Sequence, residues 1–590
     1  MKRSETDSRF KWRLEDIFET NEAWEKEFSE LEARIPSISL IKEHLTDDAQ
    51  SMKKGLDEIY DIYFHMERIF TYAKMRQDED GSVSLYQGMT QRAGSLMVKV
   101  SSALAFLEPM LLKLDDDRMK TFIEAPELKE YSFELRNILR KKQHVLSEES
   151  EKLLSEADEI ARGSREIFGM LDNVDISFRP FEHEGKDIEL SHAKYMSLLQ
   201  DQDRELRKKA FDNYYGYFRD HINTLAATYL SSVRSDIFFA KARNYASALE
   251  NALFQDNVST EVYDSLLRKI HENMGLLHDY VALRKKILGV DELHMYDIYV
   301  PLVRDFSNSY TFEDAEKMIL EALKVLGEDY TDTARHAFTD GWMDVYENDG
   351  KRSGAYSWGV YGTHPFMLLN TREDLGSVFT IAHELGHSMH TYYSNSNQPY
   401  PTAGYTIFVA EVASTVNEIL LTKYLMRTVK DPALKIYVLN HYIDQFRTTV
   451  FRQTQFAEFE KIVHEEIEKG NAMTAEGLCS LYGKINADYY GPSMEEDDTI
   501  ALEWARIPHF YSAFYVYKYA VGFSCASAIV RKLETDPAMK DRYRRFLSAG
   551  GSDYPENILR DAGIEVGEAV ELCMQEFGAA LEEYKKICEG

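Results

Sequence analysis

Two histidines four residues apart, His383 and His387, and the adjoining Glu384 form the most informative motif of the sequence. On a helix, residues four apart lie one turn apart on nearly the same face, so both imidazoles can bind one metal ion. Glu384 points about 100° away, beside the metal, where a carboxylate can accept a proton from metal-activated water. The motif predicts the metal-binding helix of a zinc hydrolase.

The residues around this motif have the pattern of a helix that is at least partly buried. Asp374 or Thr371 can cap its start. Unpaired imidazoles are costly on a buried helix, which favours a metal site over the alternative of two histidines packed in a core. His390 lies about 10 Å beyond His383 along the axis, too far for bonds of about 2.1 Å to one ion. We expect His390 to be a helix-face histidine without a ligand role. The apolar positions at helical spacing are Leu375, Val378, Phe379, Ala382 and Leu385.

A second apolar helical segment, residues 405–421, supplies a candidate third ligand. Glu411 stands in its middle, and a carboxylate in such surroundings needs a cation or several hydrogen-bond donors nearby. We therefore predict Glu411 as the third zinc ligand. Glu418, two turns further on, is the alternative, either as the ligand or as an acceptor for a ligating histidine. An ordinary ion pair between Glu411 and a lysine or arginine also stays open.

Five stretches of the sequence, taken together, follow one family pattern: His294–Leu302, Gly354–Ser357, Pro365–Asn370, His383–His390 and Ile507–Tyr519. They resemble the M3 metallopeptidases, and most of all the bacterial oligoendopeptidase F branch. The resemblance implies that His383, His387 and Glu411 bind one Zn²⁺ per chain and that Glu384 is the general base. It also implies a zinc-dependent endopeptidase that hydrolyses internal bonds of short, unfolded oligopeptides.

The last of these stretches is rich in aromatic residues. Most of its rings are expected to pack in a core, but histidine and tyrosine can also donate hydrogen bonds to an oxyanion. In the family that the sequence resembles, a histidine and tyrosines of this region do so. His509 and Tyr517 match best, and eight residues apart they would share a helix face. Tyr511 and Tyr515 stay alternatives, because Phe514 stands where the mammalian members have a tyrosine.

The segment 354–370, just before the metal helix, favours β-structure. Tyr356 and Trp358 are β-prone, and the glycines around them allow close backbone approach. Such a segment can present an edge strand that pairs with the backbone of a substrate, and an ordinary sheet edge is the alternative.

Composition indicates a large soluble protein. The 590 residues are 44% hydrophobic and 29% charged, with a net charge of −31, which argues against nucleic-acid and anionic membrane partners. Four cysteines without Cys-x-x-Cys spacing favour a reduced, cytoplasmic setting. The N-terminus lacks an apolar signal core, and no uncharged apolar run is long enough to span a bilayer. The oligomeric state is unknown at this stage.

Periodicity predicts a mainly α fold. Strands are expected at 174–179 and 186–190, around Glu184-Gly185, and within 354–370. A soft boundary near residue 200 separates an N-terminal helical region, 1–199, from a catalytic domain, 200–590. The resemblance implies a two-lobed helical metallopeptidase with a deep substrate cleft and a small β-sheet beside the zinc helix. Helices are expected near 22–34, 49–77, 83–113, 127–141, 147–171, 259–287, 312–326, 402–426, 432–469, 505–532 and 566–587.

Two other functions stay open. One is a catalytically inactive peptide-binding protein of the same fold, which the intact Glu384 argues against. The other is a zinc hydrolase of non-peptide amides, which does not explain the aromatic and edge-strand motifs.

Overall fold

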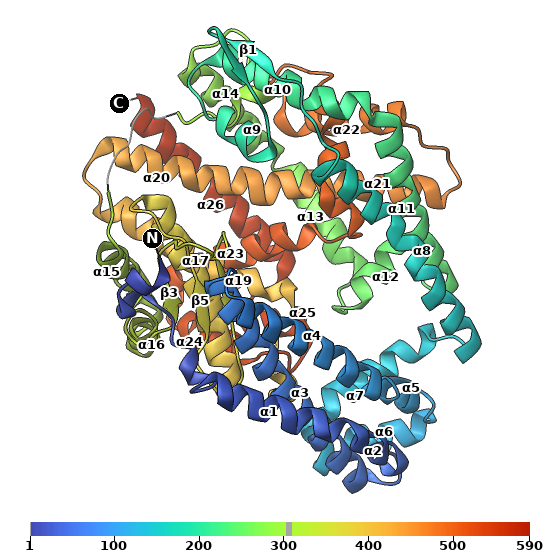
Figure 1. Cartoon of the computed structure of the whole chain (residues 1–590). Coiled ribbons are helices and arrows are strands. Elements are labelled where there is room, and N and C mark those ends of the chain that lie inside the picture. The colour runs from blue at the N-terminus through green and yellow to red at the C-terminus, as the bar shows by residue number, and fades with distance from the viewer. Residues whose placement is uncertain (1, 303–308, 590) are drawn as a thin grey trace. The chain divides into compact units, whose positions relative to one another are not determined.

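The computed structural model describes residues 2–302 and 309–589, and it is mainly helical, as predicted (Figure 1). The chain forms two compact units, each assembled from separate stretches of sequence. The predicted boundary near residue 200 does not coincide with these units, because residues 144–199 fold with unit 2. The assignment of 1–199 and 200–590 as two regions of the sequence stays a prediction. Unit 1 takes the described parts of Met1–Gln143, Ser307–Tyr424 and Lys532–Gly563, and unit 2 those of His144–Phe306, Leu425–Arg531 and Ile564–Gly590.

Unit 1 is built on the long helix α3, which buries one apolar face. The Asp48 side chain accepts a hydrogen bond from the Ser51 amide and caps the helix. Met52, Leu56 and Ile59, three to four residues apart, lie in a core that extends to strand β5. The helices of this unit are α1 (Asn21–Arg34), α2 (Ile38–His44), α3 (Ala49–Glu79), α4 (Ser84–Leu104), α5 (Leu107–Leu112), α6 (Asp116–Glu124), α7 (Ser132–Lys141), α15 (Phe312–Leu323), α16 (Glu328–Thr339), α17 (Leu375–Asn397), α18 (Tyr400–Ala403), most of α19 (Ile407–Thr428), α24 (Met539–Ser548) and α25 (Pro555–Asp561).

A small sheet of unit 1 packs against α17, as the family resemblance implied. Its three strands are β3 (Met343–Asp344), β4 (Tyr356–Trp358) and β5 (Phe366–Leu368). The fully buried β5 lies in the centre, parallel to β3 and antiparallel to β4. Strand β4 is therefore an edge strand, as the segment 354–370 suggested.

One segment of unit 1, Ser84–Leu112, is long and apolar enough to cross a membrane by length and composition alone. The sequence was expected to contain no uncharged apolar run long enough to span a bilayer. Ser84–Leu112 is apolar on average but contains charged residues. Arg92 of α4 forms an ion pair with Glu25 of α1. Lys99 forms another with Glu32 about two turns further on. A single such helix is a weak indication, because a core helix of a soluble protein passes the same test.

Unit 2 contains the predicted hairpin, but its first strand is shifted. Strands β1 (Phe181–His183) and β2 (Lys186–Ile188) flank Glu184-Gly185, both of which have positive φ. The prediction of a strand at 174–179 is wrong. Glu184-Gly185 forms a two-residue turn, and such a turn pairs the residues directly before and after it, which are His183 and Lys186. The helices are α8 (Glu148–Asn173), α9 (His192–Leu198), α10 (Arg204–Asp220), α11 (Ile222–Ala242), α12 (Ala248–Phe254), α13 (Thr260–Glu272), α14 (Met274–Leu288), α20 (Pro432–Gln445), α21 (Arg452–Glu468), α22 (Ala475–Tyr490), most of α23 (Tyr517–Thr535) and α26 (Val566–Glu589).

Candidate metal centre and active site

Helix α17 carries the motif residues His383, Glu384 and His387. The Asp374 side chain accepts a hydrogen bond from the Ser377 amide and caps the helix, as one of the two capping predictions had it. The two imidazole rings lie 4.8 Å apart, and their Nε2 atoms are separated by 3.2 Å. The four-residue spacing thus directs both Nε2 atoms to one point.

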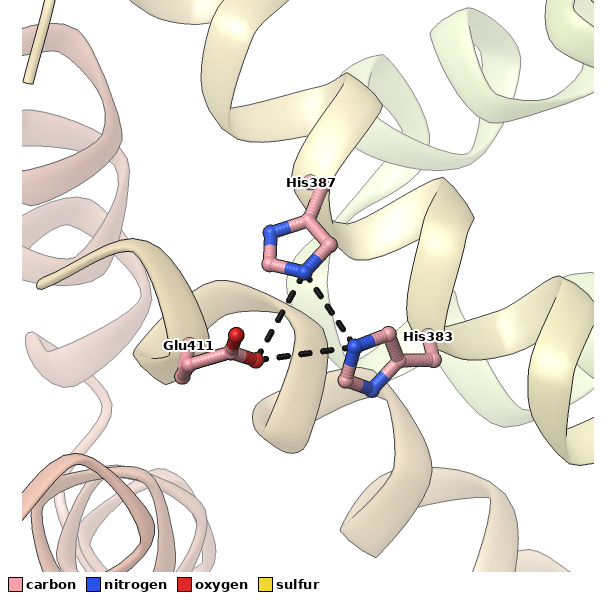
Figure 2. Close-up of side chains that lie close together, drawn as sticks. All are labelled: His383, His387 and Glu411. Atoms are coloured by element: carbon pink, nitrogen blue, oxygen red, sulfur yellow. Dashed lines mark hydrogen bonds and ion pairs between the residues drawn. The ribbon is translucent and has the colours of Figure 1, made fainter. Parts of the chain in front are cut away.

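Glu411 of α19 completes a triangle with the two histidines (Figure 2). Its Oε2 atom lies 3.5 Å from His383 Nε2 and 3.6 Å from His387 Nε2. Ligand atoms at about 2.1 Å from a tetrahedral zinc ion lie about 3.4 Å from one another, so the triangle has the size that zinc requires. The three side chains are between 18% and 33% exposed, so a fourth ligand position can be reached from solvent.

The chemistry of the three donors also fits a metal. Two imidazole nitrogens and one carboxylate oxygen are a ligand set that zinc takes in catalytic sites. Within the described residues, the polar partners of the Glu411 carboxylate are His383, His387 and the Ser414 hydroxyl, with no lysine or arginine among them. The structure therefore gives no support to the alternative of an ordinary ion pair.

Glu418 holds the far side of the His383 ring. Its Oε1 atom lies 2.5 Å from Nδ1 of His383, so that nitrogen donates to the carboxylate and Nε2 is left to face the triangle. Burial alone would lower the pKa of His383, but the Glu418 hydrogen bond and charge outweigh it and raise that pKa to about 9. Glu418 was predicted, as one alternative, to accept a hydrogen bond from a ligating histidine, and its position in the structure agrees with that role.

Gly386, inside the motif, allows α17 and α19 to approach closely. A Cβ atom at this position would lie 2.5 Å from the Ser414 Cα atom and 2.6 Å from the Ala413 carbonyl oxygen. Close packing of the two helices brings Glu411 and Glu418 to the histidines. This role of Gly386 was not predicted from the sequence, although a glycine in a helix interior often marks close packing.

Glu384 is 8% exposed and lies next to the triangle. Burial, together with the Glu411 charge, raises its pKa to about 7, although the neighbouring His383 and a hydrogen bond from the Ser357 backbone act in the opposite direction. Ser357 belongs to the edge strand β4, and its hydroxyl lies 2.8 Å from that of Ser388 on α17. The sheet edge is thereby attached to the helix turn that carries Glu384.

His390 is buried away from the triangle. Its ring stacks on Tyr405 at 3.7 Å and also contacts Phe546. Complete burial lowers the pKa of His390 to about 3, so it is a neutral core side chain. It is not part of the ligand group, in line with the distance argument.

The aromatic stretch of unit 2 is not one helix. A 3₁₀ turn, η11 (Pro508–Tyr511), comes first, and α23 begins only at Tyr517. Between them, Phe514 has a φ of 54°, which no right-handed helix contains. The prediction that His509 and Tyr517 share a helix face is therefore wrong.

The burial of these rings separates the candidate donors. Tyr517 is fully buried, with its ring 5.1 Å from that of Tyr263. His509 is exposed and lies nearly parallel to Tyr515 at 6.1 Å, while Tyr519 meets both rings edge-on. Burial, with the charge of a nearby arginine, lowers the pKa of His509. Tyr511 is half-buried like Tyr515 and Tyr519, and its ring stacks on that of Phe168 at 4.5 Å. The donor roles stay predictions.

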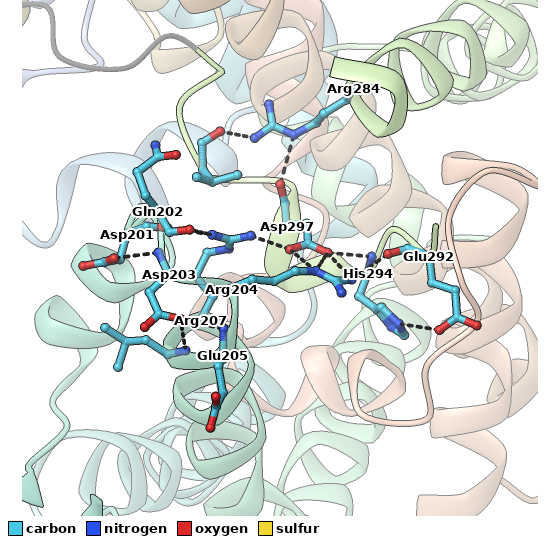
Figure 3. A network of polar contacts seen from close by, with 12 residues as sticks. Asp201, Gln202, Asp203, Arg204, Glu205, Arg207, Arg284, Glu292, His294 and Asp297 are labelled. Carbon is cyan, nitrogen blue, oxygen red and sulfur yellow. Dashed lines mark hydrogen bonds and ion pairs between the residues drawn. The ribbon is translucent and has the colours of Figure 1, made fainter. Parts of the chain in front are cut away.

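The motif His294–Leu302 has a structural explanation within unit 2 (Figure 3). Asp297 is completely buried and accepts hydrogen bonds from Arg204 and Arg207 of α10. Arg284 of α14 donates to the main-chain carbonyl of Asp297. A buried carboxylate is stable only when it is paired and hydrogen-bonded in this way. The motif therefore fastens two helices to the loop that follows α14.

A second group that could hold a metal ion consists of His183, Glu184 and Asp203 in unit 2. His183 Nε2 lies 2.8 Å from Asp203 Oδ2, and both carboxylates are exposed. A histidine–carboxylate hydrogen bond explains this group without an ion.

Comparison with known proteins gives one consistent result. A model of the family described as Peptidase family M3 matches residues 197–575, and one described as Oligopeptidase F matches residues 111–178. The chain is 43% identical to the oligopeptidase PepF of Bacillus subtilis, over 99% of this chain and 88% of that protein.

Solved structures agree with this result. A protein from Chlamydophila abortus is 32% identical with a TM-score of 0.95, and the match covers 99% of both chains. The oligoendopeptidase-F of Enterococcus faecium is 37% identical with a TM-score of 0.74, over 96% of this chain and 99% of that one.

Proposed function

Since the chain belongs to peptidase family M3 and is a metalloendopeptidase, we propose that zinc is its metal and that short, unfolded oligopeptides are its substrates. The proposal is supported above all by the distances of 3.2 to 3.6 Å among the three ligand atoms, with a buried glutamate on the same helix. The names of the relatives, oligopeptidase and oligoendopeptidase, support the substrate class.

His383, His387 and Glu411 would hold the zinc ion, one per chain, and Glu418 would keep Nδ1 of His383 protonated and its ring oriented. When bound, zinc supplies a Lewis acid that polarises the scissile carbonyl and lowers the pKa of water. The protein contributes the fixed orientation of three ligands from two helices.

Glu384 would act as the general base and then as the general acid. Its carboxylate accepts a proton from the attacking water and afterwards donates it to the leaving amine. Burial raises the pKa of Glu384, which makes its carboxylate a stronger base than an exposed glutamate. The Ser357 amide on β4 keeps the carboxylate in place between the two steps.

Two further roles complete the proposal. The edge strand β4, which is half-buried, would pair with the peptide backbone, which gives affinity with little side-chain selectivity. His509 and a tyrosine would donate hydrogen bonds to the oxyanion of the tetrahedral intermediate. Burial of Tyr517 favours Tyr515 as that tyrosine, although Tyr517 matches the family pattern better. The deep cleft that the family resemblance implies stays a prediction.

The test is cleavage of a short, internally quenched peptide with and without a chelator. We expect chelation to abolish cleavage and zinc to restore it, with about one zinc ion per chain by elemental analysis. Denatured casein should be cut far more slowly than the short peptide. Binding without cleavage would instead identify an inactive peptide-binding protein, and hydrolysis of simple amides alone would identify a different hydrolase.

We also propose a cytoplasmic location. The described part of the chain contains no disulfide, which fits a reducing compartment. Fractionation of cells that produce the tagged protein would test it.

A further inference from the structure

The turn between η11 and α23 adopts a backbone conformation that is unusual for its residue. Phe514 has a φ of 54°, in the left-handed region that a phenylalanine rarely occupies. Its side chain is 2% exposed, and its ring lies 4.6 Å from that of His464 and 5.8 Å from that of Tyr263. Such a conformation persists only where the surrounding structure imposes it.

A buried carboxylate holds this turn. The Phe514 amide donates a hydrogen bond of 2.8 Å to Oε1 of Glu460, which lies on α21 and is 1% exposed. The other carboxylate oxygen of Glu460 has no hydrogen-bond partner among the described residues. Burial raises the pKa of Glu460 to about 8. A carboxyl group is costly in such a place, so its contact with the turn accounts for its presence better than packing does.

The turn separates the rings of the aromatic stretch into two sets. Phe514 and Tyr517 point into the core, where both contact Tyr263. His509 and Tyr515 lie on the accessible side, with their rings nearly parallel. A right-handed conformation at Phe514 would change the direction of the chain immediately before Tyr515. The orientation of the accessible rings therefore depends on the turn.

We propose that Glu460 is a positioning residue for peptide hydrolysis. Its Oε1 atom fixes the left-handed conformation of Phe514, and this conformation sets the His509 and Tyr515 rings in the arrangement that stabilises the oxyanion. The inference rests on the donor roles given under the proposed function. Glu460 itself touches neither the metal ligands nor, on this account, the substrate.

The test separates the reach of the side chain from its ability to ionise. Glu460→Asp keeps the carboxyl group but is one methylene too short to reach the Phe514 amide. Glu460→Gln keeps an oxygen at the same reach and cannot ionise. Glu460→Met removes the acceptor without burying a charge, so it tests the same contact if the aspartate variant does not fold. Gln455→Met is the matched control, because Gln455 is buried on the same helix and donates to Asn486, away from the turn.

Four quantities are measured: kcat and KM on the quenched peptide, zinc per chain, and hydrogen exchange at the Phe514 amide by mass spectrometry. In the Asp and Met variants we expect faster exchange at Phe514 and a fall in kcat of about 10-fold or more, with KM and zinc nearly unchanged. Glu460→Gln and Gln455→Met should stay within about 3-fold of the wild-type kcat.

Two results would overturn the inference. One is an unchanged kcat in the folded Asp or Met variant. The other is an equal loss in Glu460→Gln, which would mean that the carboxyl group itself, and not the reach of its oxygen, is the important property. His509→Ala, measured in the same assay, shows whether the positioning role of Glu460 or the donor role of His509 is wrong. If His509→Ala loses kcat and Glu460→Asp does not, only the positioning role is wrong. If His509→Ala keeps full kcat, the donor role itself is wrong.

Discussion

The metal triangle of unit 1 and the aromatic turn of unit 2 fix their side chains by different means. The triangle comes from two regular helices that are packed closely at Gly386, so the backbone of each helix determines where its ligands lie. The aromatic turn has no regular structure at Phe514, and one buried hydrogen bond from the Phe514 amide to Glu460 holds it.

This difference predicts two kinds of sensitivity. Side chains on packed helices keep their places when a neighbouring polar contact is removed, because many backbone hydrogen bonds and apolar contacts remain. A turn that depends on one contact loses its geometry when that contact is lost. Substitutions in the triangle should therefore act through the substituted group itself, whereas substitutions around the turn should act at a distance.

The largest effect is expected for the histidines of the triangle. His383→Ala or His387→Ala removes one of three protein ligands, so zinc and activity should be lost together, with kcat/KM down by about 10³-fold or more. Elemental analysis and the quenched-peptide assay measure the two losses. His336→Ala, at an exposed histidine of α16 in the same unit, is the control and should change neither. A His383→Ala variant that keeps stoichiometric zinc would show that the triangle is not the metal site.

The next effect separates chemistry from metal binding. Glu384→Gln keeps the shape of the side chain and removes the base, so zinc should stay while kcat falls by roughly 10²-fold or more. Glu411→Gln should instead weaken zinc retention, because a neutral amide is a poorer ligand than a carboxylate. Zinc content after dialysis against a weak chelator distinguishes the two variants. Normal retention in Glu411→Gln would show that the Glu411 carboxylate is not needed to hold the metal.

The helical part of the site could be predicted from sequence because helical geometry is nearly invariant. The spacing of His383 and His387 placed both side chains on one face, and the apolar surroundings of Glu411 singled it out. Glu418 was recognised as a possible acceptor for a histidine. Gly386 was missed, because its effect depends on α19, which sequence spacing alone does not bring close.

The aromatic stretch could not be predicted in the same way. Helical periodicity from His509 to Tyr517 assumed that φ stays negative throughout. Phe514 violates this assumption in a turn whose amide bonds to Glu460, some fifty residues away in sequence, and sequence periodicity does not reveal such a contact. The predicted position of the first hairpin strand was wrong for a local reason. The two-residue turn at Glu184-Gly185 determines which residues pair, and the alternating polarity of 174–179 does not.

A smaller effect is expected where the two helices meet. Gly386→Ala places a Cβ atom 2.5 Å from the Ser414 Cα atom, so α17 and α19 must move apart. We expect a destabilisation of about 1–3 kcal/mol and a zinc affinity about 10-fold lower. Chemical denaturation and zinc titration measure the two changes. Gly376→Ala on the same helix meets only the Asp374 side chain at 3.4 Å and is the control, with no loss of affinity. Equal behaviour of both variants would mean that the close approach does not position Glu411.

The smallest effect, and the sharpest test of the turn, compares two tyrosines on either side of it. Tyr515→Phe removes a hydroxyl from the accessible ring next to His509, so kcat should fall by about 5- to 10-fold with little change in KM. Tyr517→Phe removes a hydroxyl from a fully buried ring, so it should change kcat by less than about 2-fold and act on stability, if at all. Steady-state kinetics and thermal melting of both variants, with zinc content as a check, give the comparison. If the order is reversed, so that Tyr517→Phe loses kcat and Tyr515→Phe does not, the spacing pattern of the family identifies the donor better than burial does, and the buried hydroxyl must become accessible during turnover.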